Sequence, residues 1–131
     1  KFEFDAEQIT DEGLAQLTRF KNLEVLSLRD SKVTDAGMIY VKQLGSLQEL
    51  NLHDCKGITD AGLENLSGLK NLRKLILNGT RVAGPGLKHL HGLSNLLSFE
   101  ILARQADKHD TDELQRRLPQ CEVLLVVPMD R

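Results

Sequence analysis

The 131-residue chain is 40% hydrophobic and 27% charged, and its formal net charge is -2. Such a composition is typical of a globular chain that buries a continuous core. The lack of a basic excess argues against a nucleic-acid partner. The longest apolar run, residues 123–127, is far too short to cross a bilayer, so we expect no membrane insertion.

Leucine replaces the aromatic residues as the main apolar side chain, since aromatics make up only 4% of the chain. This bias favours a core built from repeated layers. The sequence begins with Lys1 rather than Met, which leaves both the compartment and a processed or excised N-terminus open. Its two cysteines, Cys55 and Cys121, do not make a disulfide framework, and we expect two free thiols.

A strand motif with alternating leucines recurs along the chain. Side chains alternate between the two faces of a strand, so Leu-x-Leu predicts a strand with one buried face. In chain order the complete copies are Leu23-x-x-Leu26-x-Leu28, Leu47-x-x-Leu50-x-Leu52, Leu72-x-x-Leu75-x-Leu77 and Leu96-x-x-Phe99-x-Ile101. Partial copies lie at the two ends: Phe2-x-Phe4 and Leu118-x-x-Cys121-x-Val123. We align Phe4 with Leu28 and Val123 with Ile101, which predicts six strands.

A second motif, which starts a short helix after each strand, keeps the same period. Its copies are Ile9-Thr10-Asp11-Glu12-Gly13-Leu14, Val33-Thr34-Asp35-Ala36-Gly37-Met38, Ile58-Thr59-Asp60-Ala61-Gly62-Leu63 and the degraded Val82-Ala83-Gly84-Pro85-Gly86-Leu87. We interpret the Thr or Asp as a helix cap, whose oxygen accepts a hydrogen bond from a first-turn amide, rather than as part of a calcium ladder. Apolar residues at every third position, such as Leu63, Leu66 and Leu69, place one face of each helix against the strands.

The two motifs predict an α/β solenoid in which a parallel sheet lines the concave face and short helices cover the convex face. We expect one domain over residues 1–131. Its units are residues 1–24, 25–48, 49–73, 74–97 and 98–120, followed by a C-terminal cap strand within residues 121–131.

These repeats resemble the leucine-rich-repeat family. The unit Leu47-Gln48-Glu49-Leu50-Asn51-Leu52-His53-Asp54-Cys55-Lys56-Gly57-Ile58-Thr59-Asp60-Ala61-Gly62-Leu63 is similar to the cysteine-containing subtype found in substrate-recruiting subunits of ubiquitin ligases. Neighbouring units, with Ser31 or Thr80 in place of Cys55 and one residue fewer, look more like short bacterial, planctomycete-like repeats. The resemblance implies a recognition scaffold without shared catalytic residues. We therefore expect a protein-binding module that is not an enzyme and needs no cofactor.

Strand alternation predicts which side chains lie on the concave face. The first column is Lys1, Val25, Glu49, Lys74 and Ser98; the second is Glu3, Ser27, Asn51, Ile76, Glu100 and Glu122; the third is Asp5, Arg29, His53, Asn78 and Leu102. We predict a partner-binding patch at the centre of this face: Arg29, Asn51, His53, Lys74, Ile76 and Asn78. A guanidinium, amides and an exposed aliphatic group are common at hot spots. Neutral drift on a solvated face explains the same variety.

Residues that suggest chemistry have structural explanations. His53-Asp54-Cys55 suggests a metal or nucleophile site, but strand alternation is expected to separate His53 from Asp54, and Cys55 is expected at an inner turn position. His89 and His91 lie two residues apart on a helix, which is poor spacing for one metal ion. We interpret the charged residues 104–110 as a solvated loop. No metal site is expected.

The first predicted strand, around Phe2 and Phe4, has no capping segment before it, so a parallel edge is expected to be open. This edge supports an alternative function. The chain would then be a structural or assembly domain of a larger protein or complex, such as a ligase adaptor, that makes its contact through Phe2 and Phe4.

Overall fold

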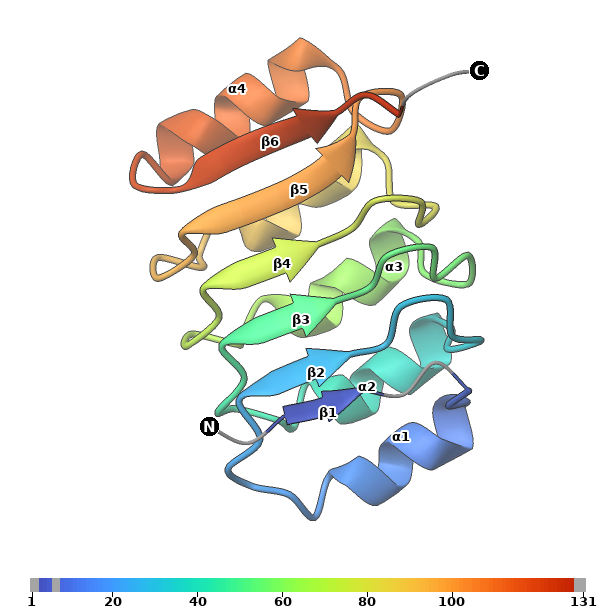
Figure 1. Cartoon of the computed structure of the whole chain (residues 1–131). Helices are drawn as coiled ribbons and strands as arrows, with labels where there is room; N and C mark the ends of the chain where they lie inside the picture. Colours follow the sequence, from blue (N-terminus) through green and yellow to red (C-terminus); the bar gives the residue numbers. More distant parts are fainter. Residues whose placement is uncertain (1–2, 6–7, 129–131) are drawn as a thin grey trace.

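A computed structural model describes residues 3–5 and 8–128. The described chain forms one parallel sheet whose strands follow chain order, and the helical segments lie behind it (Figure 1). The strands are β1 (Glu3–Asp5), β2 (Val25–Ser27), β3 (Glu49–Asn51), β4 (Lys74–Ile76), β5 (Ser98–Leu102) and β6 (Glu122–Val126). The helical segments are α1 (Asp11–Leu17), η1 (Asp35–Gly37), α2 (Met38–Val41), α3 (Asp60–Leu63), η2 (Glu64–Leu66), η3 (Gly84–Leu90) and α4 (Lys108–Arg117). The predicted α/β solenoid is confirmed.

Much of the helical layer is 3₁₀, a geometry that fits the three-residue spacing of its apolar side chains. A 3₁₀-helix has three residues per turn, so positions i and i+3 lie on one line. In the fourth unit Leu87, Leu90 and Leu93 are all buried, and η3 is entirely 3₁₀. In α4 the buried Leu114 lies four residues before Leu118, the buried residue that caps the helix, and that segment is an α-helix.

The core lies between the sheet and the helices. Its strand layer consists of the inward-facing side chains Leu26, Leu50, Leu75 and Phe99, all of them buried. The turns that leave the strands add small polar side chains, as predicted. The buried Cys55 thiol donates to the Leu28 carbonyl at 2.9 Å. Both cysteines are free and buried, which confirms the expectation of two free thiols.

The register of the two terminal strands differs from the sequence alignment by two residues. Phe4 pairs with Leu26 instead of Leu28, and Val123 pairs with Phe99 instead of Ile101. The physical reason is the period of two. A shift of two residues keeps the same side chains on the buried face, so the hydrophobic pattern alone does not choose between the registers.

The Thr-Asp pairs link neighbouring units, a role that the capping interpretation missed for Asp. Thr34 and Thr59 do cap their helices, because each hydroxyl oxygen accepts a hydrogen bond from an amide two residues on. The aspartates instead accept hydrogen bonds from the threonine of the following unit. The Asp11 carboxylate accepts from the amide and hydroxyl of Thr34, and Asp35 accepts from the same two groups of Thr59.

We call this row of contacts the carboxylate ladder; its carboxylates are those of Asp11, Asp35 and Asp60. Its third member, Asp60, accepts from the Ala83 amide at 2.7 Å. The glycine of each following motif leaves room for the carboxylate. A Cβ built on Gly62 would lie 2.3 Å from Asp35 Oδ1. The ladder explains why Asp and Gly recur together in the motif.

The charged stretch 104–110 is not a solvated loop throughout. The Gln105 carboxamide crosses to the preceding unit, where its Oε1 accepts from the Gly79 amide at 2.8 Å and its Nε2 donates to the Val82 carbonyl at 3.0 Å. Ala106 is buried, and α4 begins at Lys108. The Gln105 side chain thus joins this unit to the preceding one, where Gly84 stands in the position of the ladder aspartates and supplies no carboxylate.

Candidate partner-binding face

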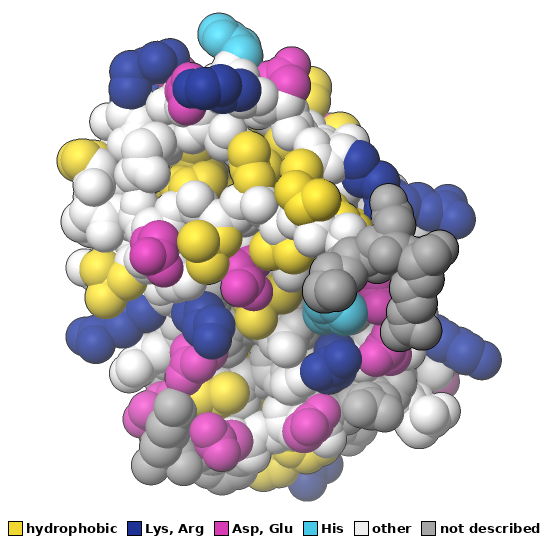
Figure 2. Space-filling view, turned by 45° about the horizontal axis from the view of Figure 1, so that its top comes forward, with side chains coloured by type: hydrophobic (Ala, Val, Ile, Leu, Met, Phe, Trp, Pro, Cys, Tyr) yellow, Lys and Arg dark blue, Asp and Glu magenta, His cyan; other side chains and the backbone are white. Residues whose placement is uncertain are grey.

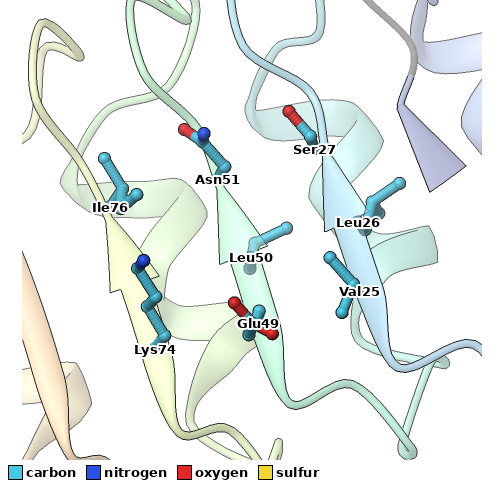
Figure 3. Close-up of a pocket in the computed structure, with 8 residues that line it drawn as sticks. All are labelled: Val25, Leu26, Ser27, Glu49, Leu50, Asn51, Lys74 and Ile76. Carbon is cyan, nitrogen blue, oxygen red and sulfur yellow. The ribbon is translucent and has the colours of Figure 1, made fainter. Parts of the chain in front are cut away.

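The outward-pointing side chains of β1 to β6 form a surface that we call the open face; it is the face predicted to be concave. At its centre lies a hollow of about 130 Å³ on strands β2, β3 and β4 (Figure 3). The residues that line this hollow are Val25, Leu26, Ser27, Glu49, Leu50, Asn51, Lys74 and Ile76.

Parallel register builds this hollow from two rows of side chains. Val25, Glu49 and Lys74 lie side by side in the first row, and Ser27, Asn51 and Ile76 form the second. Strand alternation turns both rows outward, whereas Leu26 and Leu50 between them are buried. The hollow therefore has aliphatic groups beside amide, hydroxyl and charged groups.

The structure divides the predicted patch into two parts. Asn51, Lys74 and Ile76 line the hollow. The three others, Arg29, His53 and Asn78, follow the ends of β2, β3 and β4. Arg29 is exposed, with its Nε 3.5 Å from Asp30 Oδ2.

Asn78 is only 8% exposed and offers little surface to a partner. The hollow also contains Val25, Ser27 and Glu49, which were predicted to lie on this face but not in the patch. The strand register identifies these three residues as part of the site, because they lie beside Asn51, Lys74 and Ile76 in the same two rows.

The expected separation of His53 from Asp54 is wrong. His53 Nδ1 lies 3.2 Å from Asp54 Oδ2. Alternation stops at the strand end, since β3 ends at Asn51 and Asp54 adopts a left-handed backbone with φ of 58°. That conformation, which Asp tolerates better than most residues, returns the carboxylate toward the imidazole.

Charges of both signs are spread over the open face, and Figure 2 shows acidic and basic side chains among hydrophobic ones. The acidic side chains of its strands are Glu3, Asp5, Glu49, Glu100 and Glu122; Lys74 is the basic one. Hydrophobic groups gather toward β6 (Figure 2), where the outward-facing residues that pair with Glu100 and Leu102 are Leu124 and Val126. This mixture suits a protein surface better than a phosphate backbone.

The thiols are poorly placed for nucleophilic chemistry. Burial is the main cause that raises the pKa of Cys55, and the same effect raises the pKa of Cys121 to about 11. A thiolate is the reactive form of cysteine. Both side chains are therefore held as neutral thiols at neutral pH, in keeping with a structural role.

A model of the leucine-rich repeat matches residues 21–41 and 46–67, which contain the strand and helix motifs of the second and third units. The six parallel strands extend the same pattern through the described chain. The matched segments are leucine-rich repeats, and the described fold is a leucine-rich-repeat solenoid. Among the curated proteins, none matches this leucine-rich-repeat chain.

Two solved structures share the fold of this leucine-rich-repeat protein. An internalin from Listeria monocytogenes superposes with a TM-score of 0.66 at 21% identity, covering 88% of the chain and 31% of the internalin. A leucine-rich-repeat protein of Leptospira interrogans superposes with a TM-score of 0.58 at 20% identity, covering 95% of the chain and 37% of that protein. The chain thus spans about a third of the length of either. Within its described residues, no helix has the length and apolarity needed to traverse a bilayer.

Proposed function

We propose that residues 1–131 form a single protein-interaction module that binds its partner on the open face, around the hollow between β2 and β4. The observation that carries this proposal is the composition of the hollow. Aliphatic groups of Val25 and Ile76 lie beside the hydrogen-bonding groups of Ser27 and Asn51. The match of two segments to the leucine-rich-repeat model supports the same assignment, because solenoids of this kind commonly act as recognition scaffolds.

The size of the hollow favours a protein partner over a small molecule. Its volume of about 130 Å³ is below the roughly 300–1,000 Å³ of typical ligand pockets. An aliphatic side chain of the partner would contact Val25 and Ile76, and polar groups beside it would meet Asn51 and Ser27. Lys74, which is exposed at the margin, would pair with an acidic group of the partner.

The repeat itself supplies variants that test the site without disturbing the fold. Ile76→Asn copies Asn51, its partner in the same row on the neighbouring strand β3, and Lys74→Glu copies Glu49 in the same way. We expect each to weaken binding of a partner captured with the wild-type chain, by about 2 kcal/mol where the residue is a hot spot. Lys88→Glu on the exposed side of η3 is the matched control. Unchanged affinity of both open-face variants, measured by calorimetry, would move the contact away from this face.

A second function, assembly through the N-terminal edge, is favoured by Thr10, the first threonine of the repeated Thr-Asp motif. Among the described residues, Thr10 has no carboxylate partner such as Thr34 and Thr59 have, and its hydroxyl makes no cap hydrogen bond. β1 is an edge strand, and Phe4 is partly buried against the core. Phe2, the other residue of the predicted edge contact, lies outside the described residues.

We propose that an acidic side chain of a neighbouring repeat or chain binds Thr10 if this edge is used. Thr10→Val should then weaken association measured by sedimentation equilibrium, and Thr18→Val, on the far end of α1, should not. A wild-type chain that stays monomeric at every concentration would count against self-assembly by this edge.

A protein partner, no nucleic acid and no cofactor stay our expectations for this module. The net charge of -2 supports the expectation of no nucleic-acid partner, because proteins that bind a phosphate backbone gain most of their affinity from basic side chains. The buried thiol of Cys55 donates to a backbone carbonyl, which supports an architectural role over catalysis.

A further inference from the structure

We propose that Asp30, His53 and Asp54 form a binding site for a divalent transition-metal ion such as Zn²⁺, at the rim of the open face. Each residue offers one ligand atom, and these three atoms all lie within 4.8 Å of one another. They come from two successive units, so one ion would bridge the turns that leave β2 and β3. The site goes beyond the proposed function, because it lies outside the hollow and needs no partner.

The backbone holds the three ligands in place before any ion binds. The amide of Asp30 donates to the His53 carbonyl at 2.8 Å, which joins the two turns. Asp30 and Asp54 share the left-handed conformation, with φ of 59° and 58°. Equivalent positions in successive units therefore direct both carboxylates toward the same imidazole.

Two buried atoms that make no hydrogen bond support a ligand here. Among the described residues, the buried side-chain nitrogen and oxygen atoms without a hydrogen bond are His53 Nδ1, which lies 3.2 Å from Asp54 Oδ2, and Asn78 Oδ1, which has no such neighbour in any ion pair. The amide of Asp54 donates to the Asn78 carbonyl at 2.8 Å, which places Asn78 in the next unit beside His53 and Asp54. Asn78 is more than nine-tenths buried.

Buried polar atoms normally make hydrogen bonds. Two such atoms without a hydrogen bond in neighbouring units therefore suggest one common ligand. In the tautomer with Nδ1 deprotonated, the imidazole nitrogen has a lone pair, as the amide oxygen has. A metal cation flanked by the two carboxylates is a partner that both atoms can bind.

Existing ion pairs leave the carboxylates available. Lys56 Nζ is 3.5 Å from Asp54 Oδ1, while the other oxygen of Asp54 faces His53. Arg29 approaches Asp30 at 3.5 Å, and both side chains are about half exposed. Exposed pairs of this kind contribute little stability, so a metal ion loses little by competing with them.

The donor set indicates the class of metal. Imidazole suits Zn²⁺ and its neighbours in the transition series, whereas Mg²⁺ and Ca²⁺ take oxygen ligands only. One nitrogen and two carboxylates make three ligands, and Zn²⁺ in proteins takes a fourth, such as water or an amide oxygen. Asn78 Oδ1, which makes no hydrogen bond in the described structure, is a candidate from the next unit.

Isothermal titration of the whole, chelator-treated chain with Zn²⁺ tests the site. We expect one ion per wild-type chain. The repeat again supplies conservative variants: His53→Asn copies Asn78, and Asp54→Gly copies Gly79, whose φ is 81°. Each should weaken Zn²⁺ binding by more than the roughly tenfold that loss of even an outer-shell partner costs.

The controls are His91→Asn and His109→Asn, which remove the imidazoles of a separate hollow beside Asp110 and Glu113. They should leave the affinity unchanged. Cobalt(II) added instead of zinc gives a second readout, since its visible absorption should be lost in His53→Asn but kept in His91→Asn. If either His53→Asn or Asp54→Gly fails to fold by circular dichroism, Asp30→Asn takes its place.

Three results would overturn the proposal: no heat of Zn²⁺ binding by the wild-type chain, an affinity that survives loss of His53, or an affinity that disappears with His91 or His109. None of these results would bear on the partner-binding hollow, because its test variants at Ile76 and Lys74 leave all three metal ligands intact.

Discussion

The carboxylate ladder makes a prediction about Gly62, which lies inside α3. Replacing glycine by alanine within a helix normally stabilises a protein by about 0.5–1 kcal/mol. Here the new Cβ would lie 2.3 Å from Asp35 Oδ1 and 3.3 Å from the flexible Met38 side chain. The carboxylate must move, and we expect Gly62→Ala to destabilise the chain.

The size of the effect follows from what Asp35 holds. Its carboxylate accepts hydrogen bonds from the amide and the hydroxyl of Thr59, both partly buried. Hydrogen bonds to charged groups contribute about 1.5–3 kcal/mol each when buried. Partial exposure lets water replace some of this, so we expect Asp35→Ala to cost about 2 kcal/mol. Gly62→Ala should lose a similar amount of stability because it displaces the same carboxylate. The usual gain from alanine in a helix offsets part of that loss, which leaves a net cost of about 1 kcal/mol.

The double variant Asp35→Ala with Gly62→Ala is decisive, because the two effects should not add. Without the carboxylate, alanine at position 62 meets only the Met38 side chain, and the ordinary helix preference returns. Gly62→Ala should therefore change sign and stabilise the Asp35→Ala background by up to about 1 kcal/mol. The corresponding coupling is about 2 kcal/mol, within the range seen for residues in contact.

Urea unfolding followed by far-ultraviolet circular dichroism measures these energies, since the chain has no Trp and a single Tyr. Gly68→Ala is the matched control, because nothing lies within 4 Å of its Cβ position. It should change the free energy of unfolding by less than about 0.5 kcal/mol. A Gly62→Ala cost that is the same with and without Asp35 would refute the role given to the carboxylate.

Three further predictions concern other parts of the fold. Iodoacetamide should label neither Cys55 nor Cys121 in the native chain near pH 8 and both in urea, because burial raises the pKa of each thiol; rapid native labelling would contradict their burial. Gln105→Ala should cost about 1–3 kcal/mol in urea unfolding by leaving the buried Gly79 amide unpaired, whereas the exposed Gln43→Ala should be nearly neutral. Burial, and then the charge of Arg117, lowers the pKa of His91. The unfolded chain therefore binds this proton more readily, so the free energy of unfolding should fall as the pH is lowered from roughly 7 to 5. His91→Gln should make that fall smaller.

Sequence periodicity predicted the parallel sheet, its strand order and the buried face of each helix, because these depend on spacings of two and three residues. It failed where a spacing is ambiguous. Phe4 and Val123 keep their faces under a shift of two residues, and the structure places them two positions from the sequence alignment.

The contact between His53 and Asp54 was missed for a different reason. Alternation holds only inside a strand, and Asp54 follows β3 in a left-handed turn. Likewise, the spacing of Asp35 from Gly62 is visible in the sequence, but capping already explained the aspartate. Only the structure shows that Thr59 provides the cap while Asp35 contacts the next unit.

The ladder also bears on how the chain tolerates differences in length between its units. Residues 55–59 of the third unit span one residue more than the equivalent residues 31–34 of the second. Gly57 accommodates the extra residue, since a Cβ there would lie 2.6 Å from the Val33 carbonyl oxygen. Strand pairing fixes the chain before this stretch and Asp35 fixes it afterwards, at Thr59. Longer and shorter units can therefore alternate in one array without changing the position of the helices that follow.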